Sequence, residues 1–398
     1  MAALAAFLCS GLASCGVGGD VEEFPSAPPE AAVLEEVKPD SVDLPDPPEP
    51  TEEDLAAARI EDLLSSMTLE EKVGQLFFAR CPAGGAVEDV SACHLGGYLL
   101  FGRDFQTGGG SWLTAEQFTE KIESYQAAAR IPLLIGVDEE GGTVVRASRN
   151  PNLFPGGKCR SPQWLLAHGE EDAFAEDARE KNGLLLSYGI NVNLAPVCDV
   201  STAPGGFIYD RTLGQDARTT ADYVGRVVKT MGDLPIGSVL KHFPGYGDNA
   251  DTHTGIAVDD RPLEQFTDAD FLPFRAGIAA GGGTAAVLVS HNIVRCMDAE
   301  LPASLSPAVH KILRETLEFN GVVMTDDLDM GALAAYGRAG LTAVAALEAG
   351  NDLLITADYR TGIEMVLAAV ENGGLSEAAV ENACRRVLTW KQALGLIP

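Results

Sequence analysis

The segment KHFPGYGDNADTHTG, residues 241–255, brings together side chains that could carry out acid–base chemistry or hold a polar ligand. It contains Lys241, His242, Asp251 and His253, and so two of the six histidines of the chain. Its glycines and proline disfavour a helix interior, and it has too few apolar residues for a strand. The segment is therefore predicted to be a loop, where catalytic and binding residues concentrate.

Asp251 and His253 are two positions apart, so on an extended loop both side chains can point the same way. A carboxylate bonded to one imidazole nitrogen orients the ring and favours its protonated form. Such a pair would make a general acid that can later act as a base. A surface pair without a function is the alternative, and the spacing alone does not separate the two.

The sequence VVMTDDLDMGA places Asp326 and Asp327 at the end of an apolar run. A carboxylate at the end of a buried strand is costly unless it is solvated or paired. Capping of a following helix could explain Asp327 or Asp329, because aspartate suits that position. It explains Asp326 less well, since that residue still belongs to the strand end, and a carboxylate held there could be a nucleophile.

The elements that position these residues follow from the alternation of short apolar runs with longer amphipathic segments. Eight runs are predicted to be strands: 75–79, 96–101, 132–138, 191–200, 237–243, 285–291, 321–327 and 351–356. Helices are predicted between most of them and at the end of the chain, among them 114–129, 220–233 and 375–395. Continuous apolar strands separated by helices predict a parallel sheet buried on both faces. Eight of them predict an α/β fold with a single (β/α)₈ barrel of the TIM type.

Polar side chains follow several of these runs at the point where each run ends. They are Asp138, Asp199, His242, His291 and Asp326. In a (β/α)₈ barrel the carboxyl ends of the strands converge on one rim, where active sites are found. We therefore expect these side chains to meet. The sequence shows no internal repeat, and no second domain is expected after the last helix.

The first fifteen residues, MAALAAFLCSGLASC, are small or apolar and carry no charged side chain. The run is too short to span a bilayer as a mature helix and is typical of a signal peptide. Its last four residues, Leu12 to Cys15, resemble the lipobox of bacterial lipoproteins, which implies cleavage after residue 14 and lipidation of Cys15. No Lys or Arg precedes the run, and an ordinary cleaved signal is the alternative. The expected location is outside the cytoplasm, anchored to the outer face of the bacterial cell membrane.

Residues 16–54 contain thirteen Asp or Glu, one Lys and eight Pro, so they are predicted to be a disordered, extended tether. The predicted organisation is a signal peptide at 1–14, a lipidated cysteine with an acidic, proline-rich linker at 15–54, and the barrel at 55–398. The net charge of −30 argues against nucleic acid and anionic lipid as partners. Membrane attachment is expected through the lipid anchor only, and a neutral or weakly charged substrate fits this charge best.

Six cysteines belong to the predicted folded part: Cys81, Cys93, Cys159, Cys198, Cys296 and Cys384. None of them forms a CxxC pair or a zinc-like cluster, so no metal site is predicted. Cys198 and Cys296 lie in or beside apolar runs, and most of the six are predicted to be core thiols. The sequence leaves a disulfide between Cys81 and Cys93 open.

Several motifs resemble family 3 of the glycoside hydrolases, in its bacterial β-N-acetylglucosaminidase branch. The loop at 241–253 is similar to the signature K-H-F-P-G-H-G…D-S-H of that branch. Further similar segments are MTLEEKVGQLF (67–77), VDEEGGTVVR (137–146), INVNLAPVCDV (190–200), DRTLG (210–214), LPASLS (301–306) and GVVMTDDLDMGA (321–332). Their order and spacing extend the resemblance over about residues 55 to 398.

The resemblance implies that Asp326 is the nucleophile and that His253, paired with Asp251, is the acid/base. The sugar's hydroxyls and acetamido group would be held by Asp138, Arg146, Arg211, Lys241 and His242. The family is retaining, so the reaction would pass through a covalent glycosyl-enzyme. No metal or organic cofactor is required. The implied substrate is non-reducing terminal N-acetylglucosamine on peptidoglycan or muropeptide-type glycans.

Three features depart from the family pattern. Tyr246 stands where the signature has a second histidine, and altered packing rather than lost activity is expected. Thr143 and Glu139 replace an arginine and a glutamine, which would alter the sugar-binding end of the site or the packing of the domain. No C-terminal α/β domain of the kind found in some relatives is expected, and the site is expected to be complete within the barrel.

Three alternatives stay open. The first is phosphorolysis, because a histidine acid/base repels an incoming phosphate less than a carboxylate would. The second is another sugar of the same family, a β-glucoside or β-xyloside. The third is a non-catalytic sugar-binding lipoprotein, which would need the residues that hold hydroxyls but neither Asp326 nor His253.

Overall fold

Eight parallel strands in the order β10-β1-β2-β3-β4-β5-β7-β9 form the centre of the domain. A parallel bridge between Met324 and Leu353 brings β9 beside β10, so the sheet is a nearly closed barrel. The computed structural model describes residues 50–398 except 171, 248–254 and 337–338. The strands are β1 (Phe77–Arg80), β2 (Gly97–Leu100), β3 (Leu134–Val137), β4 (Val192–Asn193), β5 (Gly237–Phe243), β7 (Ala285–Val289), β9 (Val323–Thr325) and β10 (Leu354–Thr356).

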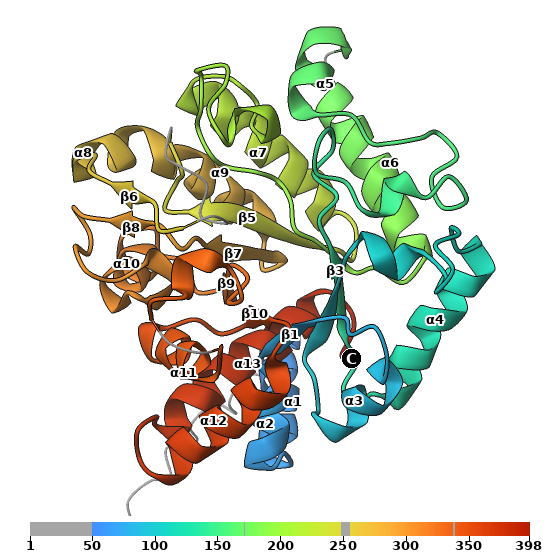
Figure 1. Cartoon of the computed structure of the whole chain (residues 1–398), viewed down its shortest axis with the longest axis vertical. Helices are drawn as coiled ribbons and strands as arrows, with labels where there is room; N and C mark the ends of the chain where they lie inside the picture. Colours follow the sequence, from blue (N-terminus) through green and yellow to red (C-terminus); the bar gives the residue numbers. More distant parts are fainter. Residues whose placement is uncertain (1–49, 171, 248–254, 337–338) are drawn as a thin grey trace, which may run out of the picture. The chain divides into compact units, whose positions relative to one another are not determined.

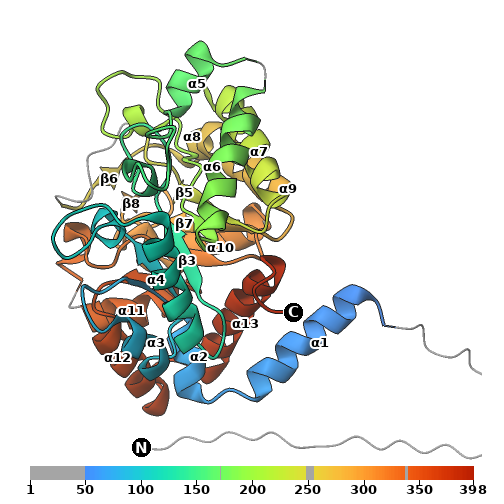
Figure 2. The same cartoon turned by 90° about the vertical axis from the view of Figure 1, so that its right-hand side faces the viewer.

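Helices surround the strands (Figure 1). They are α1 (Glu52–Ser65), α2 (Leu69–Gln75), α3 (Ala86–Ala92), α4 (Ala115–Ala128), α5 (Pro162–His168), α6 (Ala173–Ser187), α7 (Ala217–Gly232), α8 (Leu263–Gln265), α9 (Phe271–Gly281), α10 (Pro307–Lys311), α11 (Ala339–Ala349), α12 (Tyr359–Glu371) and α13 (Glu377–Ala393). The N-terminal helix α1 packs against α13 (Figure 2). The (β/α)₈ barrel predicted from the sequence is confirmed.

The sequence explains these elements locally. Every residue of β7 is buried, as required of a strand that has helices outside and a packed barrel interior inside. The helices α2 and α4 begin at capping boxes in which Thr68 pairs with Glu71 and Thr114 pairs with Gln117. Each of the eight predicted runs overlaps one barrel strand, with β1 ending one residue beyond its run, and α4, α7 and α13 lie where helices are predicted.

Two features of the sheet differ from the prediction. The strand β4 covers only two residues of the run 191–200, because Pro196 lacks the N–H group that a central strand needs. A second sheet pairs β6 (Val258–Asp259) with β8 (Ile293–Val294) in parallel. Strands of two residues are too short to show a periodicity in the sequence, so this sheet was not predicted.

The six cysteines of the domain are free thiols, so the disulfide between Cys81 and Cys93 is not formed. Cys81, Cys198 and Cys384 are buried, as predicted for core thiols. The prediction for most of the six is wrong, because Cys93 and Cys159 are half-buried and Cys296 is exposed. The apolar run before it ends at β8, and the chain turns outward at Cys296. No helix in the part of the chain that the structure describes is long and apolar enough to cross a membrane.

Lys391, on α13, is completely buried, and its Nζ donates a hydrogen bond to Gln75 Oε1 at 2.7 Å. Burial lowers the pKa of Lys391 to about 7. Above pH 7 the folded amine is therefore neutral, whereas the unfolded amine keeps its proton to about pH 10. Between these values the unfolded state binds more protons, so this residue makes folding more favourable as the pH rises.

We predict that the free energy of unfolding of the wild type rises relative to that of Lys391→Met by roughly 1.4 kcal/mol per pH unit above pH 7. Urea unfolding at pH 7, 8 and 9 measures this difference. The exposed Lys311 on α10 offers the matched control, and Lys311→Met should differ from the wild type by the same amount at each pH. A pH-independent difference for Lys391→Met would show that the buried amine does not titrate in this range.

Candidate active site

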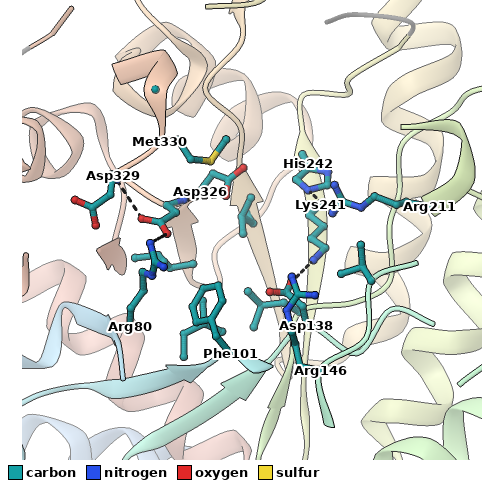
Figure 3. A pocket seen from close by; sticks show the side chains of 17 residues that line it. Arg80, Phe101, Asp138, Arg146, Arg211, Lys241, His242, Asp326, Asp329 and Met330 are labelled. Carbon is teal, nitrogen blue, oxygen red and sulfur yellow. Dashed lines mark hydrogen bonds and ion pairs between the residues drawn. The ribbon is translucent and has the colours of Figure 1, made fainter. Parts of the chain in front are cut away.

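A pocket of about 450 Å³ opens at the carboxyl ends of the barrel strands. Six of the eight side chains predicted for the site line it together: Asp138, Arg146, Arg211, Lys241, His242 and Asp326 (Figure 3). They come from segments far apart in the sequence, as expected for strand ends that share one rim. The other two, Asp251 and His253, lie outside the described residues. The roles of all eight stay predictions.

One wall of the pocket is a buried network of charges centred on Lys241. Its Nζ lies 2.6 Å from Asp138 Oδ1 and 2.6 Å from Glu140 Oε1. Arg211 pairs with both oxygens of Glu140, from Nε at 2.9 Å and from Nη2 at 2.7 Å. Burial alone would raise the pKa of Glu140, but Arg211 and Lys241 hold it well below its ordinary value. Glu140 therefore stays ionised and fixes both cations at the wall.

His242 is held in one orientation by two partners. Its Nδ1 lies 2.7 Å from Asp199 Oδ2, and its Nε2 lies 3.1 Å from Arg211 Nη2. Because a guanidinium can only donate, Nε2 accepts, and the ring proton is on Nδ1, which donates to Asp199. Residues 241–243 belong to β5, so the prediction of a loop over 241–255 is wrong for these three, which continue the buried strand. Asp199 Oδ1 also accepts the backbone N–H of Tyr246 at 2.7 Å, so the same carboxylate fixes the chain just after β5.

Two departures from the family pattern are explained by their contacts. Tyr246 is buried, and its ring centre lies 5.4 Å from that of His242 and 5.7 Å from that of Phe207, so the ring packs between them. That activity is kept with tyrosine at this position stays a prediction. Glu139 is buried and accepts the backbone N–H groups of Arg146 at 2.9 Å and Ala147 at 2.8 Å. It shapes the turn that presents Arg146 to the pocket. Thr143, in contrast, is exposed and does not line the pocket.

Asp326 lies directly after β9, on the opposite side of the pocket from Lys241 (Figure 3). Its Oδ1 accepts the backbone N–H of Asp327 at 2.8 Å. Burial would raise the pKa of Asp326, but the neighbouring imidazoles of His291 and His242, the hydrogen bond from Asp327 and the ammonium group of Lys241 hold the pKa below its ordinary value. The carboxylate is therefore ionised and faces the pocket, as a nucleophile must be.

Asp327 and Asp329 hold the turn that follows Asp326. Asp327 Oδ2 pairs with Arg80 Nη1 at 3.1 Å, and burial raises the pKa of Asp327 to about 6. Asp329 Oδ2 accepts from Thr356 Oγ1 at 3.1 Å and from the backbone N–H of Ala357 at 2.5 Å. Neither caps a helix, so the alternative interpretation of these two residues as helix caps is wrong. They tie the turn to β1 and β10 instead.

The comparison with known proteins identifies the family. Residues 68–390 match the family model described as the glycosyl hydrolase family 3 N-terminal domain. This chain belongs to glycoside hydrolase family 3. A protein of Stenotrophomonas maltophilia strain R551-3 named beta-hexosaminidase is 33% identical over 310 residues, which cover 75% of this chain and 87% of that protein.

Solved structures agree with the family 3 assignment. The β-N-acetylglucosaminidase of this family from Paenibacillus sp. has a TM-score of 0.75 at 30% identity, over 83% of this chain and 63% of that chain. The β-N-acetylhexosaminidase from Beutenbergia cavernae has a TM-score of 0.71 at 30% identity, over 82% of this chain and 99% of that chain. The family 3 chain is thus a glycoside hydrolase with a TIM-type barrel.

Several residues of this family 3 site were not predicted as site residues. Asp327 is adjacent to Asp326, Glu140 is two positions from Asp138, and Asp199 is identifiable only as a strand end. Arg80 ends β1, and its guanidinium lies 4.6 Å from the ring centre of Phe101 inside the pocket. The only signal in the sequence is their position at or just past a strand end, because their partners lie far away in the chain.

Replacing Glu140 with glutamine should weaken substrate binding by this family 3 hydrolase. The amide keeps the shape but loses the charge that holds Arg211 and Lys241, leaving Arg211 without its only carboxylate partner among the described residues. We expect kcat/KM to fall by about 10² and most of the loss to appear in KM, since misplaced binding groups cost about that much. Steady-state kinetics measure the split. Glu180→Gln, at an exposed position of α6, is the matched control, and an unchanged KM in Glu140→Gln would contradict the role.

Proposed function

We propose that this family 3 hydrolase is a retaining exo-β-N-acetylglucosaminidase. It would remove non-reducing terminal N-acetylglucosamine from peptidoglycan or muropeptide-type glycans. The observation that supports this most is the pocket, in which an ionised carboxylate, Asp326, lies across from the fixed donors and acceptors of Lys241, Asp138 and Arg211. The names of the relatives support an N-acetylated hexosamine as the sugar.

The proposed reaction has two steps. Asp326 attacks the anomeric carbon of the sugar, and His253 donates a proton to the departing oxygen. A water molecule, deprotonated by His253, then attacks the glycosyl-enzyme and releases the sugar with its β configuration retained. A histidine acid places no second negative charge near Asp326, and Asp251 would orient its ring.

The wall opposite Asp326 would hold the sugar during both steps. Burial alone would lower the pKa of Lys241, but the carboxylates of Asp138 and Glu140 outweigh it, so the pKa lies above its ordinary value. Lys241 therefore stays protonated. Its ammonium group can donate to sugar hydroxyls, and Asp138 can accept from them. Arg211 and His242 are fixed by Glu140 and Asp199 before substrate arrives, so little side-chain freedom is lost on binding.

The test uses the soluble domain from residue 51 and the 4-nitrophenyl β-glycosides of N-acetylglucosamine, glucose and xylose at neutral pH. We expect turnover of the acetamido sugar at least tenfold above that of the other two. Turnover of the glucoside or xyloside alone would contradict the assignment of the sugar. A folded domain that binds N-acetylglucosamine oligomers in calorimetry but turns over none of the glycosides would be the sugar-binding protein instead.

Phosphorolysis is distinguished by the product. Reactions in phosphate and in a buffer without a nucleophilic anion should give equal rates and free N-acetylglucosamine. Formation of N-acetylglucosamine 1-phosphate, together with a rate that rises with phosphate concentration, would show that the enzyme is a phosphorylase.

We also propose that the hydrolase is a lipoprotein, anchored through Cys15 to the outer face of the bacterial cell membrane by the acidic linker. The proposal rests on the lipobox-like residues 12–15. Metabolic labelling with a fatty acid in a bacterial host tests it, with Cys9→Ser as the control for Cys15→Ser. Label should be lost only in Cys15→Ser, and an unlabelled wild type would contradict the anchor.

A further inference from the structure

The turn that carries Asp326 is fixed through its neighbour, Asp327. The backbone N–H of Asp327 donates to Asp326 Oδ1 at 2.8 Å. The backbone carbonyl of Asp327 accepts two hydrogen bonds, from Met330 N at 3.0 Å and from His291 Nε2 at 2.9 Å. The peptide groups on both sides of Asp327 are therefore held, and with them the direction in which the carboxylate of Asp326 points.

His291 is well placed to hold this turn rigidly. It follows β7, the strand beside β9, and its side chain is completely buried. Its Nδ1 lies 2.7 Å from Ser304 Oγ, while the backbone of Ser304 is itself held by Ser290 O at 2.9 Å and by Asn351 Nδ2 at 2.7 Å. The imidazole thus links two fixed partners, Ser304 on one side and the carbonyl of Asp327 on the other.

The hydrogen-bonding capacity of Asp327 O and the Ser304 hydroxyl determines which nitrogen of His291 donates. A carbonyl oxygen only accepts, so Nε2 must carry a proton and donate to Asp327 O in either ionisation state of the ring. The Ser304 hydroxyl can donate to Nδ1 or accept from it, and it therefore suits both states. Any positive charge on the ring also helps to keep the pKa of Asp326 below its ordinary value.

We propose that His291 is a positioning residue for the glycosylation step: its hydrogen bond to the carbonyl of Asp327 aims the Asp326 carboxylate at the anomeric carbon. The inference rests on the proposed role of Asp326 as the nucleophile. His291 does not line the pocket, so it acts through the turn and not on the substrate. A change at His291 should therefore lower the rate of attack and leave sugar binding nearly unchanged.

Two substitutions separate the bond to Asp327 from the bond to Ser304. In His291→Gln the amide nitrogen can reach the position of Nε2, so the donor to Asp327 O is kept. In His291→Asn the shorter amide can reach only the position of Nδ1, so the contact with Ser304 is kept and the donor to Asp327 O is lost. Both variants remove the ring, and the comparison between them isolates the single hydrogen bond.

The experiment measures steady-state kinetics on 4-nitrophenyl β-N-acetylglucosaminide and the rate of covalent labelling by 5-fluoro-N-acetylglucosaminyl fluoride. In the labelling reaction the C1–F bond breaks, an Asp326 oxygen bonds to C1, and fluoride leaves. We expect labelling and kcat to fall by about 10² in His291→Asn and by no more than about tenfold in His291→Gln, with KM within about threefold of the wild type in both. Equal losses in the two variants, or a loss confined to KM, would overturn the inference.

A further variant keeps the test decisive if either His291 variant fails to fold. Ser304→Ala leaves the ring in place without its Nδ1 partner, and it should lower the labelling rate by about three- to tenfold with KM unchanged. A wild-type labelling rate in Ser304→Ala would then overturn the inference. Asp326→Asn is measured beside these variants. If it is labelled at the wild-type rate, the proposed nucleophile is wrong. If it is not labelled while both His291 variants are labelled at the wild-type rate, only the positioning role of His291 is contradicted.

Discussion

Replacing Asp326 with asparagine is expected to lower kcat on 4-nitrophenyl β-N-acetylglucosaminide by about 10⁴ or more. The amide has nearly the same shape but no negative charge, so it cannot form the covalent bond to the anomeric carbon. The hydrogen bond from the N–H of Asp327 to Oδ1 can persist in the variant, so the fold and the charged wall around Lys241 should be preserved. Unfolding temperatures within about 3 °C of the wild type would show that the loss is chemical and not structural.

A second replacement tells what Asp326 does. In Asp326→Ala the removed carboxylate leaves space for azide, which can attack the anomeric carbon while nitrophenolate leaves. Azide should restore part of the turnover and give the α-glycosyl azide, because a single displacement inverts the configuration. Asp233→Asn, at the exposed end of α7, is the matched control and should keep full activity. Asp326→Asn with more than a tenth of wild-type activity would contradict the nucleophile role.

The second large effect is expected at His253, and it should depend on the leaving group. Nitrophenolate leaves without protonation, whereas a sugar alkoxide needs a proton as the bond breaks. We expect His253→Ala to lower kcat/KM by about tenfold on the nitrophenyl glycoside and by about 10³ or more on the β-linked disaccharide of N-acetylglucosamine. Assays of both substrates with the same enzyme preparation measure the ratio.

The control for this variant is His168→Ala, which removes an exposed imidazole on α5. His168→Ala should leave kcat/KM unchanged on both the nitrophenyl glycoside and the disaccharide. The assignment of His253 as the acid would be wrong if the loss in His253→Ala were the same for both leaving groups. Asp251→Asn should show the same dependence on the leaving group with a smaller loss, because the ring stays in place without its orienting carboxylate.

The barrel could be predicted because its strands are buried, with the half-buried Arg80 at the end of β1 as the exception. Such strands appear in the sequence as continuous apolar runs, and a polar residue that ends a run is conspicuous. For this reason Asp138, His242 and Asp326 could be identified before their neighbours in space were known. Their meeting in one pocket follows from the parallel arrangement of the strands, which brings equivalent ends to the same rim.

The residues that the sequence could not reveal are those whose importance lies in a distant partner. Glu140 acquires its role from Arg211 and Lys241, which lie far along the chain. His291 could be noted only as the end of an apolar run, because its partners Asp327 and Ser304 are distant in the sequence. A carboxylate or an imidazole with no marked spacing looks the same whether it faces solvent or a buried cation. These contacts form only when the barrel brings distant segments together, and no short sequence pattern shows which segments will meet.

Proton NMR of the first-formed sugar tests the central claim most directly. The domain from residue 51 is mixed with 4-nitrophenyl β-N-acetylglucosaminide in deuterated buffer, and the anomeric signals are followed before mutarotation. A retaining β-N-acetylglucosaminidase with Asp326 as its nucleophile releases the β-anomer of N-acetylglucosamine first, and the α-anomer grows in later at the spontaneous rate. The α-anomer appearing first, or no release of the sugar by the folded domain, would contradict the proposed reaction.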